Sequence, residues 1–147
     1  MAVALAEKGM KVMQIGCDPK ADSTIQLRHG EAVPTVLSLY NEKKQALRLD
    51  DMIRIGYHHV ICVEAGGPTP GLGCAGRGII TALEKLKETG AYEVYKPDVI
   101  LYDVLGDVVW RWIFHADAKR LCGQSIYHHF RRKHGDPCGG KHCHGSR

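Results

Sequence analysis

The sequence lacks the features that would send the chain into or across a membrane. Its 147 residues contain no apolar run near the roughly 20 residues that a membrane-spanning helix needs. The opening MAVALAEKGMK has no basic segment followed by an apolar core and a small-residue cleavage site, so a secretory signal is not expected. We therefore expect one soluble domain in the cytoplasm, where cysteines serve as thiols or metal ligands rather than as a disulfide framework.

A change of composition divides the chain near residue 110. Residues 1–109 contain 12 Lys and Arg against 14 Asp and Glu, a net charge of −2, whereas residues 110–147 contain 8 against 2, a net charge of +6. The second segment also holds both tryptophans, six of the nine histidines and three of the six cysteines. We therefore treat the two segments as different kinds of sequence.

The first segment alternates apolar strands with helices. Buried-strand patterns occur at residues 11–16 (KVMQIG), 60–65 (VICVEA) and 98–104 (DVILYDV). Helical patterns occur at residues 2–8, before the stop signal Gly9, and from residue 78 to the stop signal Gly90. This alternation predicts an α/β fold, a parallel sheet with flanking helices, in which ligands bind at the carboxyl ends of the strands.

The loop GCDPKADST, at residues 16–24, directly follows the first predicted strand. Asp18 or Asp22 could orient water or a metal ion in this loop, and Lys20 could meet a phosphate group of a magnesium nucleotide. Alternatively, the loop is a turn in which Asp22 or Ser23 caps the next helix. Taken alone, the loop favours the capping turn.

The loop EAGGPTPGLGCAGRG, at residues 64–78, is rich in glycine around one cysteine. Glycines let the backbone approach a bulky inorganic group, and Cys74 could supply a thiolate ligand to an iron–sulfur cluster. Alternatively, Cys74 is an inert thiol in a tight turn, as lone cysteines usually are. A four-iron cluster would need a second cysteine from this chain and two from a symmetry mate.

The loop DVLGD, at residues 103–107, ends the third predicted strand with two aspartates around a glycine. In phosphate-hydrolysing folds, an acid at this place holds Mg²⁺ through water, and a neighbouring glycine senses the γ-phosphate. Alternatively, Asp103 and Asp107 only mark a polar strand end. Taken alone, the polar strand end is the safer interpretation.

Taken together, GCDPKADST, GGPTPGLGCAGRGIITA, GAYE and YDVLGDVV resemble the nitrogenase iron protein family over nearly all of residues 1–109. The resemblance implies an incomplete P-loop NTPase-like sheet within a homodimeric, ATP-dependent reductase. Such a protein receives electrons from ferredoxin or flavodoxin, holds them on a 4Fe–4S cluster and passes them to dinitrogenase, the molybdenum–iron protein or an equivalent. The protochlorophyllide reductase subunit is a near relative, but it resembles CDPKHDST where this chain has CDPKADST.

The resemblance also implies roles for residues around the cluster. Cys74 would be one of two cysteines per subunit that bind the 4Fe–4S cluster between identical subunits. Arg77 would match the arginine at the docking surface that some organisms ADP-ribosylate.

For the bound MgATP, the resemblance implies two nucleotide switches. Asp18, Lys20 and Asp22 would belong to the first switch. Asp103 and Asp107 would belong to the second, which couples the nucleotide state to the cluster. Asp18 and Asp107 are thereby the candidates for a part in hydrolysis.

Two departures from the family suggest that this chain alone is inactive. The family begins with a strand and a phosphate loop resembling GKGGIGKST, whereas this chain starts inside the following helix, so we expect the phosphate cradle to be missing. Family members continue DVVCGGF, where the cysteine is the second cluster ligand, whereas Val109 is followed here by Trp110.

The tail after Val109 fits a shifted reading frame. When its codons are read one nucleotide later, with free choice at degenerate positions, they can spell CGGGFSMPMRKGYADKVYIITSGENMAI, the expected family continuation apart from an extra glycine. We therefore predict that residues 1–109 are a partial nitrogenase iron protein domain. Residues 110–147 are predicted to be an irregular, out-of-frame tail that forms no domain and does not extend the sheet.

Two functions from other classes fit the sequence less well. A zinc or nucleic-acid module would use Cys138, His142, Cys143 and His144, but these residues lack the spacing of paired ligands, and the segment lacks apolar periodicity. A partitioning ATPase would share the sheet and its acidic strand end, but it has no use for a glycine-framed Cys74. We therefore expect neither a nucleic-acid partner nor a membrane partner.

Overall fold

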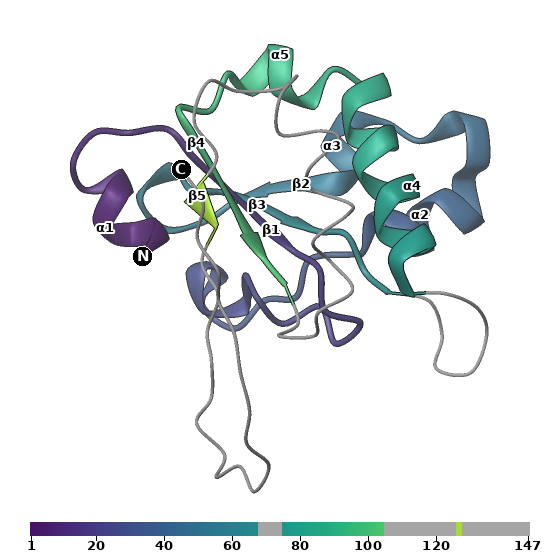
Figure 1. Ribbon diagram of the computed structural model, residues 1–147, viewed down its shortest axis with the longest axis horizontal. Coiled ribbons are helices and arrows are strands. Elements are labelled where there is room, and N and C mark those ends of the chain that lie inside the picture. Colours follow the sequence, from purple (N-terminus) through teal and green to yellow (C-terminus); the bar gives the residue numbers. More distant parts are fainter. Residues whose placement is uncertain (68–74, 105–125, 128–147) are drawn as a thin grey trace, which may run out of the picture.

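The computed structural model describes residues 1–67, 75–104 and 126–127, which form a five-stranded sheet with helices on both sides (Figure 1). The strands are β1 (Val12–Gly16), β2 (Ile53–Ile55), β3 (Ile61–Glu64), β4 (Val99–Asp103) and β5 (Ile126–Tyr127). Their order across the sheet is β2-β3-β1-β4-β5. Strand β2 is antiparallel to β3, and all other neighbouring strands are parallel. The predicted α/β fold is confirmed, and each predicted strand lies within a residue of its expected bounds.

The helices of this part of the chain are short, except for one. They are α1 (Ala2–Ala6), α2 (Val36–Lys43), α3 (Leu49–Met52), α4 (Ala75–Glu88) and α5 (Ala91–Tyr95), with 3₁₀ turns at Ile25–Arg28, Lys44–Ala46 and Tyr57–His59. The predicted helix before Gly90 is α4, and Gly90 separates it from α5 with a φ of +74° that favours glycine. No helix within the described residues is long and apolar enough to span a membrane.

The sheet separates two apolar clusters because successive side chains of a strand point to opposite faces. The larger cluster contains Met13 and Ile15 of β1 and lies under α2, α4 and α5. In α4 its members are Ile79, Ala82, Leu83 and Leu86, spaced as one face of a helix. The smaller cluster contains Val12, Cys62 and Leu101 and packs against α1. Figure 1 shows α1 on one side of the sheet and α2 with α4 on the other.

One prediction about the tail is wrong. The two residues of β5, Ile126 and Tyr127, pair in parallel with Leu101 and Tyr102 of β4 and so extend the sheet. The physical reason is that β4 would otherwise end the sheet with unpaired N–H and C=O groups, which accept any short extended segment. The other residues of the tail lie outside the described part of the chain, so the rest of that prediction stays a prediction.

Candidate functional site at the carboxyl edge of the sheet

Three residues form a row across the carboxyl edge of the sheet. Gly16 ends the central strand β1, and it is in register with Glu64 at the end of β3 and with Asp103 at the end of β4. Residues in register on parallel strands point to the same face. Two carboxylate side chains therefore flank a residue that has no side chain, on the face that also carries the smaller apolar cluster.

The missing side chain of Gly16 makes room for this arrangement. A Cβ atom built on Gly16 would overlap Glu64 Oε2, would lie 2.8 Å from Glu64 Cδ and would lie 2.6 Å from Ser23 Cβ. Any larger residue at this position would therefore push apart the Glu64 carboxylate and the loop that follows β1. The glycine is required by close approach, not by its backbone angles.

Ser23 and Thr24 bridge the two carboxylates. The Ser23 hydroxyl donates to Asp103 Oδ2 at 2.6 Å, and the side-chain amide of Gln14 donates to Ser23 Oγ at 2.9 Å. Thr24 donates twice to Glu64 Oε1, from its backbone N–H at 2.8 Å and from its hydroxyl at 2.6 Å. Two adjacent residues of the loop thus join the ends of β3 and β4, and we call residues 23 and 24 the Ser23–Thr24 bridge.

The Glu64 carboxyl group is the most unusual group of this edge. The residue is 0% exposed, and its Oε2 atom has no hydrogen-bond partner among the described residues. Burial raises the pKa of Glu64, the two hydrogen bonds from Thr24 lower it, and the charges of Asp103 and Asp22 raise it, so that the net direction is upward. A buried acid with one unsatisfied oxygen costs stability, so packing alone does not account for its presence.

The two thiols of this region are unsuited to act as thiolates. Cys17 is fully buried, and burial together with the charges of Asp103 and Glu64 raises the pKa of its thiol to about 12. Burial likewise raises the pKa of the Cys62 thiol to about 11. Because the thiolate is the form that binds metals and attacks electrophiles, both groups are structural. The backbone N–H of Cys17 donates to the Asp103 carbonyl at 2.9 Å and thereby ties the loop to β4.

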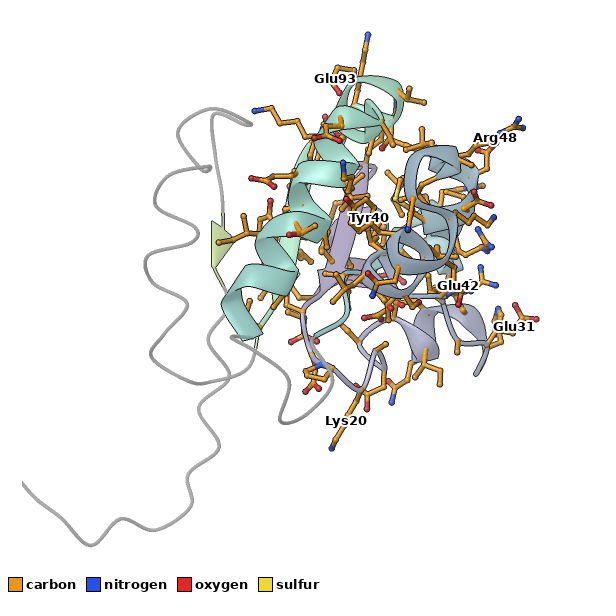
Figure 2. The ribbon with its side chains drawn as sticks, turned by 90° about the vertical axis from the view of Figure 1, so that its right-hand side faces the viewer. Lys20, Glu31, Tyr40, Glu42, Arg48 and Glu93 are labelled. Carbon is orange, nitrogen blue, oxygen red and sulfur yellow. The ribbon has the colours of Figure 1, made fainter. Side chains whose placement is uncertain are left out.

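The predicted nucleotide residues of the first loop lie in a tight turn beyond the Gly16 row. Asp18 is half-buried, and its Oδ1 accepts a hydrogen bond from the backbone N–H of Lys20 at 2.9 Å. Lys20 and Asp22 are exposed, and Figure 2 shows the Lys20 side chain extending away from the body of the molecule. The capping alternative is wrong for Ser23, because its hydroxyl donates to Asp103. The residue before the next 3₁₀ turn is Thr24, and it makes no side-chain cap bond.

The first residues of the glycine-rich loop pack against the first loop. A Cβ atom on Gly67 would overlap Pro19 Cγ, so these two segments are in close contact. Gly66 has a φ of +77° and lies against Thr35. Residues 16–24 and 65–67 therefore lie together at the carboxyl ends of β1 and β3, where the parallel sheet was predicted to place its loops.

Three predicted site residues fall at or beyond the limits of the description. Cys74 and Asp107 lie outside the described residues. Arg77 belongs to the first turn of α4, but its side chain lies outside what the structure describes. Their predicted roles remain predictions.

Glu64 and the Ser23–Thr24 bridge were not predicted from the sequence as parts of the site. The signal for Glu64 is an acid at the end of the otherwise apolar run VICVEA, where a buried parallel strand rarely holds a charge. The partner of Ser23 lies 80 residues away. No local pattern marks such a contact.

The donor set at this edge suits magnesium better than soft metals. The Asp103 carboxylate is exposed and accepts a hydrogen bond from the Ser23 hydroxyl. Mg²⁺ prefers hard oxygen ligands of this kind. Within the described ranges, no group of three or more His, Cys, Asp or Glu side chains converges as a metal site. The buried thiols Cys17 and Cys62 do not fit the ligand role of an iron–sulfur cluster.

Comparison with solved structures gives a distant likeness. Cobyrinic acid a,c-diamide synthase from Mycobacterium smegmatis, solved with a bound ATP analog and magnesium, matches 86% of this chain and 63% of its own, at 12% identity and a TM-score of 0.41. A likeness at this level carries no argument about function.

Curated relatives match much more closely, over about three quarters of the chain. The nitrogenase iron protein of Methanococcus voltae is 54% identical over 110 residues, which are 74% of this chain and 39% of the relative. Nitrogenase iron protein 2 of Paenibacillus durus is 54% identical over 109 residues, 74% of this chain and 37% of that protein. The chain thus spans about two fifths of the length of these relatives.

A family model matches a longer part of the chain. The model describes 4Fe-4S iron sulfur cluster binding proteins of the NifH/frxC family, and it matches residues 1–127, beyond Val109. The described fold is an α/β fold with a mostly parallel sheet, and the acidic row at its carboxyl edge lies where such folds bind their ligands. The chain belongs to the NifH/frxC family of 4Fe–4S iron–sulfur cluster binding proteins.

Proposed function

We propose that this chain is part of the ATP-driven reductase of nitrogenase. The whole protein would act as a cytoplasmic homodimer that hydrolyses MgATP. It would pass one electron at a time from its 4Fe–4S cluster to dinitrogenase, the molybdenum–iron protein or an equivalent. The cluster loses that electron, the partner gains it, and ferredoxin or flavodoxin restores it.

The observation that carries the proposal is the 54% identity to nitrogenase iron proteins, together with the edge that the structure describes. The loop after β1, the start of the glycine-rich loop and the end of β4 meet there, and their polar groups are already linked by hydrogen bonds. An edge that joins a nucleotide loop to a cluster loop suits a protein in which hydrolysis controls electron transfer.

Within this proposal, the nucleotide contacts come from the polar residues of the edge. Asp18, Lys20 and Asp22 face the nucleotide from the first loop, and Asp103 holds Mg²⁺ through water with Ser23 beside it. Asp18 and Asp107 are the residues proposed to take part in hydrolysis.

The cluster and the partner would be held by the glycine-rich loop and the start of α4. Cys74 supplies one thiolate, so that two subunits together hold the four irons on a two-fold axis. The bound cluster supplies the one-electron chemistry. Arg77 contacts dinitrogenase at the docking surface.

We also propose that the 147-residue chain by itself does not carry out this reaction. Val109 is followed by Trp110 in place of the cysteine that the family pattern DVVCGGF supplies. A frameshift at this point would remove the second cluster ligand. Sequencing of the gene tests the proposal: an extra or missing nucleotide near codon 109 supports it, and an intact frame with confirmed Trp110 and Trp112 codons would contradict it.

The cluster role is tested in a full-length chimera, in which residues 1–109 are joined to the remaining parts of the Methanococcus voltae iron protein. Cys74→Ser should abolish the iron content and the spectroscopic signal of the four-iron cluster, because a thiolate is replaced by a poor ligand. Cys62→Ala is the control, since the buried Cys62 thiol should leave the cluster unchanged. A normal cluster in the Cys74→Ser chimera would refute the role.

The docking role of Arg77 is tested in the same chimera. Arg77→Gln should lower electron transfer to dinitrogenase while the cluster signal stays intact, because the arginine acts at the surface between the two proteins. Lys87→Gln, at an exposed position near the end of the same helix, should change neither. Loss of the cluster in Arg77→Gln would show that the role is misassigned.

A further inference from the structure

The Glu64 carboxyl group lies where the nucleotide loop and the cluster loop meet. Its Oε1 atom accepts hydrogen bonds from the backbone N–H and the hydroxyl of Thr24. The backbone after Glu64 continues directly into the glycine-rich loop. Thr24 follows Ser23, whose hydroxyl holds Asp103. Glu64 is thus connected to Asp103 through the adjacent residues Thr24 and Ser23.

The packing around Glu64 leaves it little freedom. The side chain is fully buried over Gly16, and its Oε2 atom is unpartnered among the described residues. Groups charged like Glu64 face it from two elements, Asp103 from β4 and Asp22 from the loop after β1. Burial of an acid beside two other acids opposes folding, so this arrangement is maintained against its cost in stability.

We propose that Glu64 is a positioning residue, which clamps the Ser23–Thr24 bridge across Gly16 and so makes the nucleotide loop and the start of the cluster loop move as one unit. The nucleotide part of this inference rests on the proposed function. Glu64 need not contact nucleotide, magnesium or cluster, because it acts through Thr24 and Ser23. The isosteric Glu64→Gln keeps an acceptor oxygen for Thr24 and should preserve the clamp, whereas Glu64→Ala removes it.

The clamp is tested first in the 147-residue chain by hydrogen exchange of backbone amides. In Glu64→Ala, the Thr24 amide should exchange about tenfold faster or more than in the wild type, because it loses its hydrogen bond to the Glu64 side chain. Amides of β1 report on the stability of the whole sheet and should change much less. Glu64→Gln should exchange nearly as slowly as the wild type, and Glu42→Ala, at an exposed position on α2, should have no effect.

If Glu64→Ala unfolds the sheet, a second and milder variant tests the clamp instead. Thr24→Val removes only the hydroxyl that contacts Glu64 Oε1 and should accelerate exchange of the amides at residues 22–25 while β1 stays protected. Wild-type exchange at these amides in Thr24→Val, or in a folded Glu64→Ala, would overturn the clamp.

The coupling is tested in the full-length chimera with MgATP as the probe. In the wild type, MgATP should slow exchange at residues 16–24 and also at residues 61–67. In Glu64→Ala the response at 61–67 should fall to less than about half of the wild-type response, and Glu64→Gln should restore it. If MgATP changes neither segment in the wild type, the proposed function fails. If the wild type responds and Glu64→Ala responds equally, this inference fails.

Discussion

The acidic residues at the carboxyl edge of the sheet have different surroundings from those on the outer surface of the molecule. On the surface, Glu31 pairs with Arg28 at 2.5 Å just after a 3₁₀ turn, and Glu88 pairs with Lys85 at 2.6 Å within the last turn of α4. At the edge, Glu64 is buried, and the charged neighbours that raise its pKa are the acids Asp103 and Asp22.

The two sets of carboxylates therefore differ in what they contribute to the free energy of unfolding. A surface ion pair in a medium of high dielectric constant contributes little to the free energy of unfolding, so its removal changes that free energy only slightly. A buried acid without a cation opposes folding and is retained by natural proteins mainly at functional sites. Changes at the edge should therefore alter stability more than changes elsewhere on the molecule.

The largest effect is expected for Gly16→Ala. The added methyl group would overlap the Glu64 carboxylate and crowd Ser23, so we expect a loss of about 1–3 kcal/mol in the free energy of unfolding, measured by urea titration. In the double mutant Gly16→Ala/Glu64→Ala the loss should be smaller than the sum of the single losses, because the overlap is removed. Additive losses would show that the two residues do not press on each other.

A smaller loss is expected for Thr24→Val. This change removes one of two hydrogen bonds to the buried Glu64 carboxylate, and we expect a loss of about 1.5 kcal/mol in the same titration. Thr89→Val is the matched control, because the Thr89 hydroxyl donates only to the carbonyls of Lys85 and Leu86 at the end of α4. An equal loss in both variants would contradict the claim that the bond from Thr24 to Glu64 contributes more stability than a bond at a helix end.

The pH dependence of stability isolates the charge of Glu64. Its pKa is raised in the folded chain from an ordinary value of 4.5, so the folded state binds its proton more tightly than the unfolded state does. The stability that this proton contributes is complete below pH 4.5 and is lost as the pH rises through the folded pKa. Glu64→Gln lacks this loss, so its stability relative to the wild type should increase above pH 4.5 in titrations at successive pH values. A difference that is constant with pH would contradict the raised pKa.

The smallest effect is expected for Glu31→Gln on the outer surface. Removal of the exposed partner of Arg28 should change the free energy of unfolding by at most about 0.5 kcal/mol, and added salt should reduce even this change. A loss as large as that of Thr24→Val would erase the contrast between the two regions.

Much of the sheet was predictable because its signals are local. The apolar runs at β1, β3 and β4 and the glycine stop at Gly90 each lie within a few consecutive residues. The rule that parallel strands place their ligand loops at one edge then brought the loops after β1 and β3 together correctly. Strand β2 was missed, because its three residues, Ile53–Ile55, have a charged centre and pair antiparallel at the edge.

The contacts that build the site were not predictable, because they join distant positions. The bonds from Thr24 to Glu64 and from Ser23 to Asp103 span 40 and 80 residues. The short β5 was missed for a related reason, since it pairs with the edge of β4, which lies more than 20 residues earlier in the chain.

The most direct test of the account is the midpoint potential of the cluster in the full-length chimera, measured by redox titration with and without MgATP. If the carboxyl edge joins the proposed nucleotide loops to the proposed cluster loop, the binding of MgATP must shift that potential, because the two equilibria are then linked. The account predicts a clear nucleotide-dependent shift in the wild-type chimera. Identical potentials with and without saturating MgATP would contradict it.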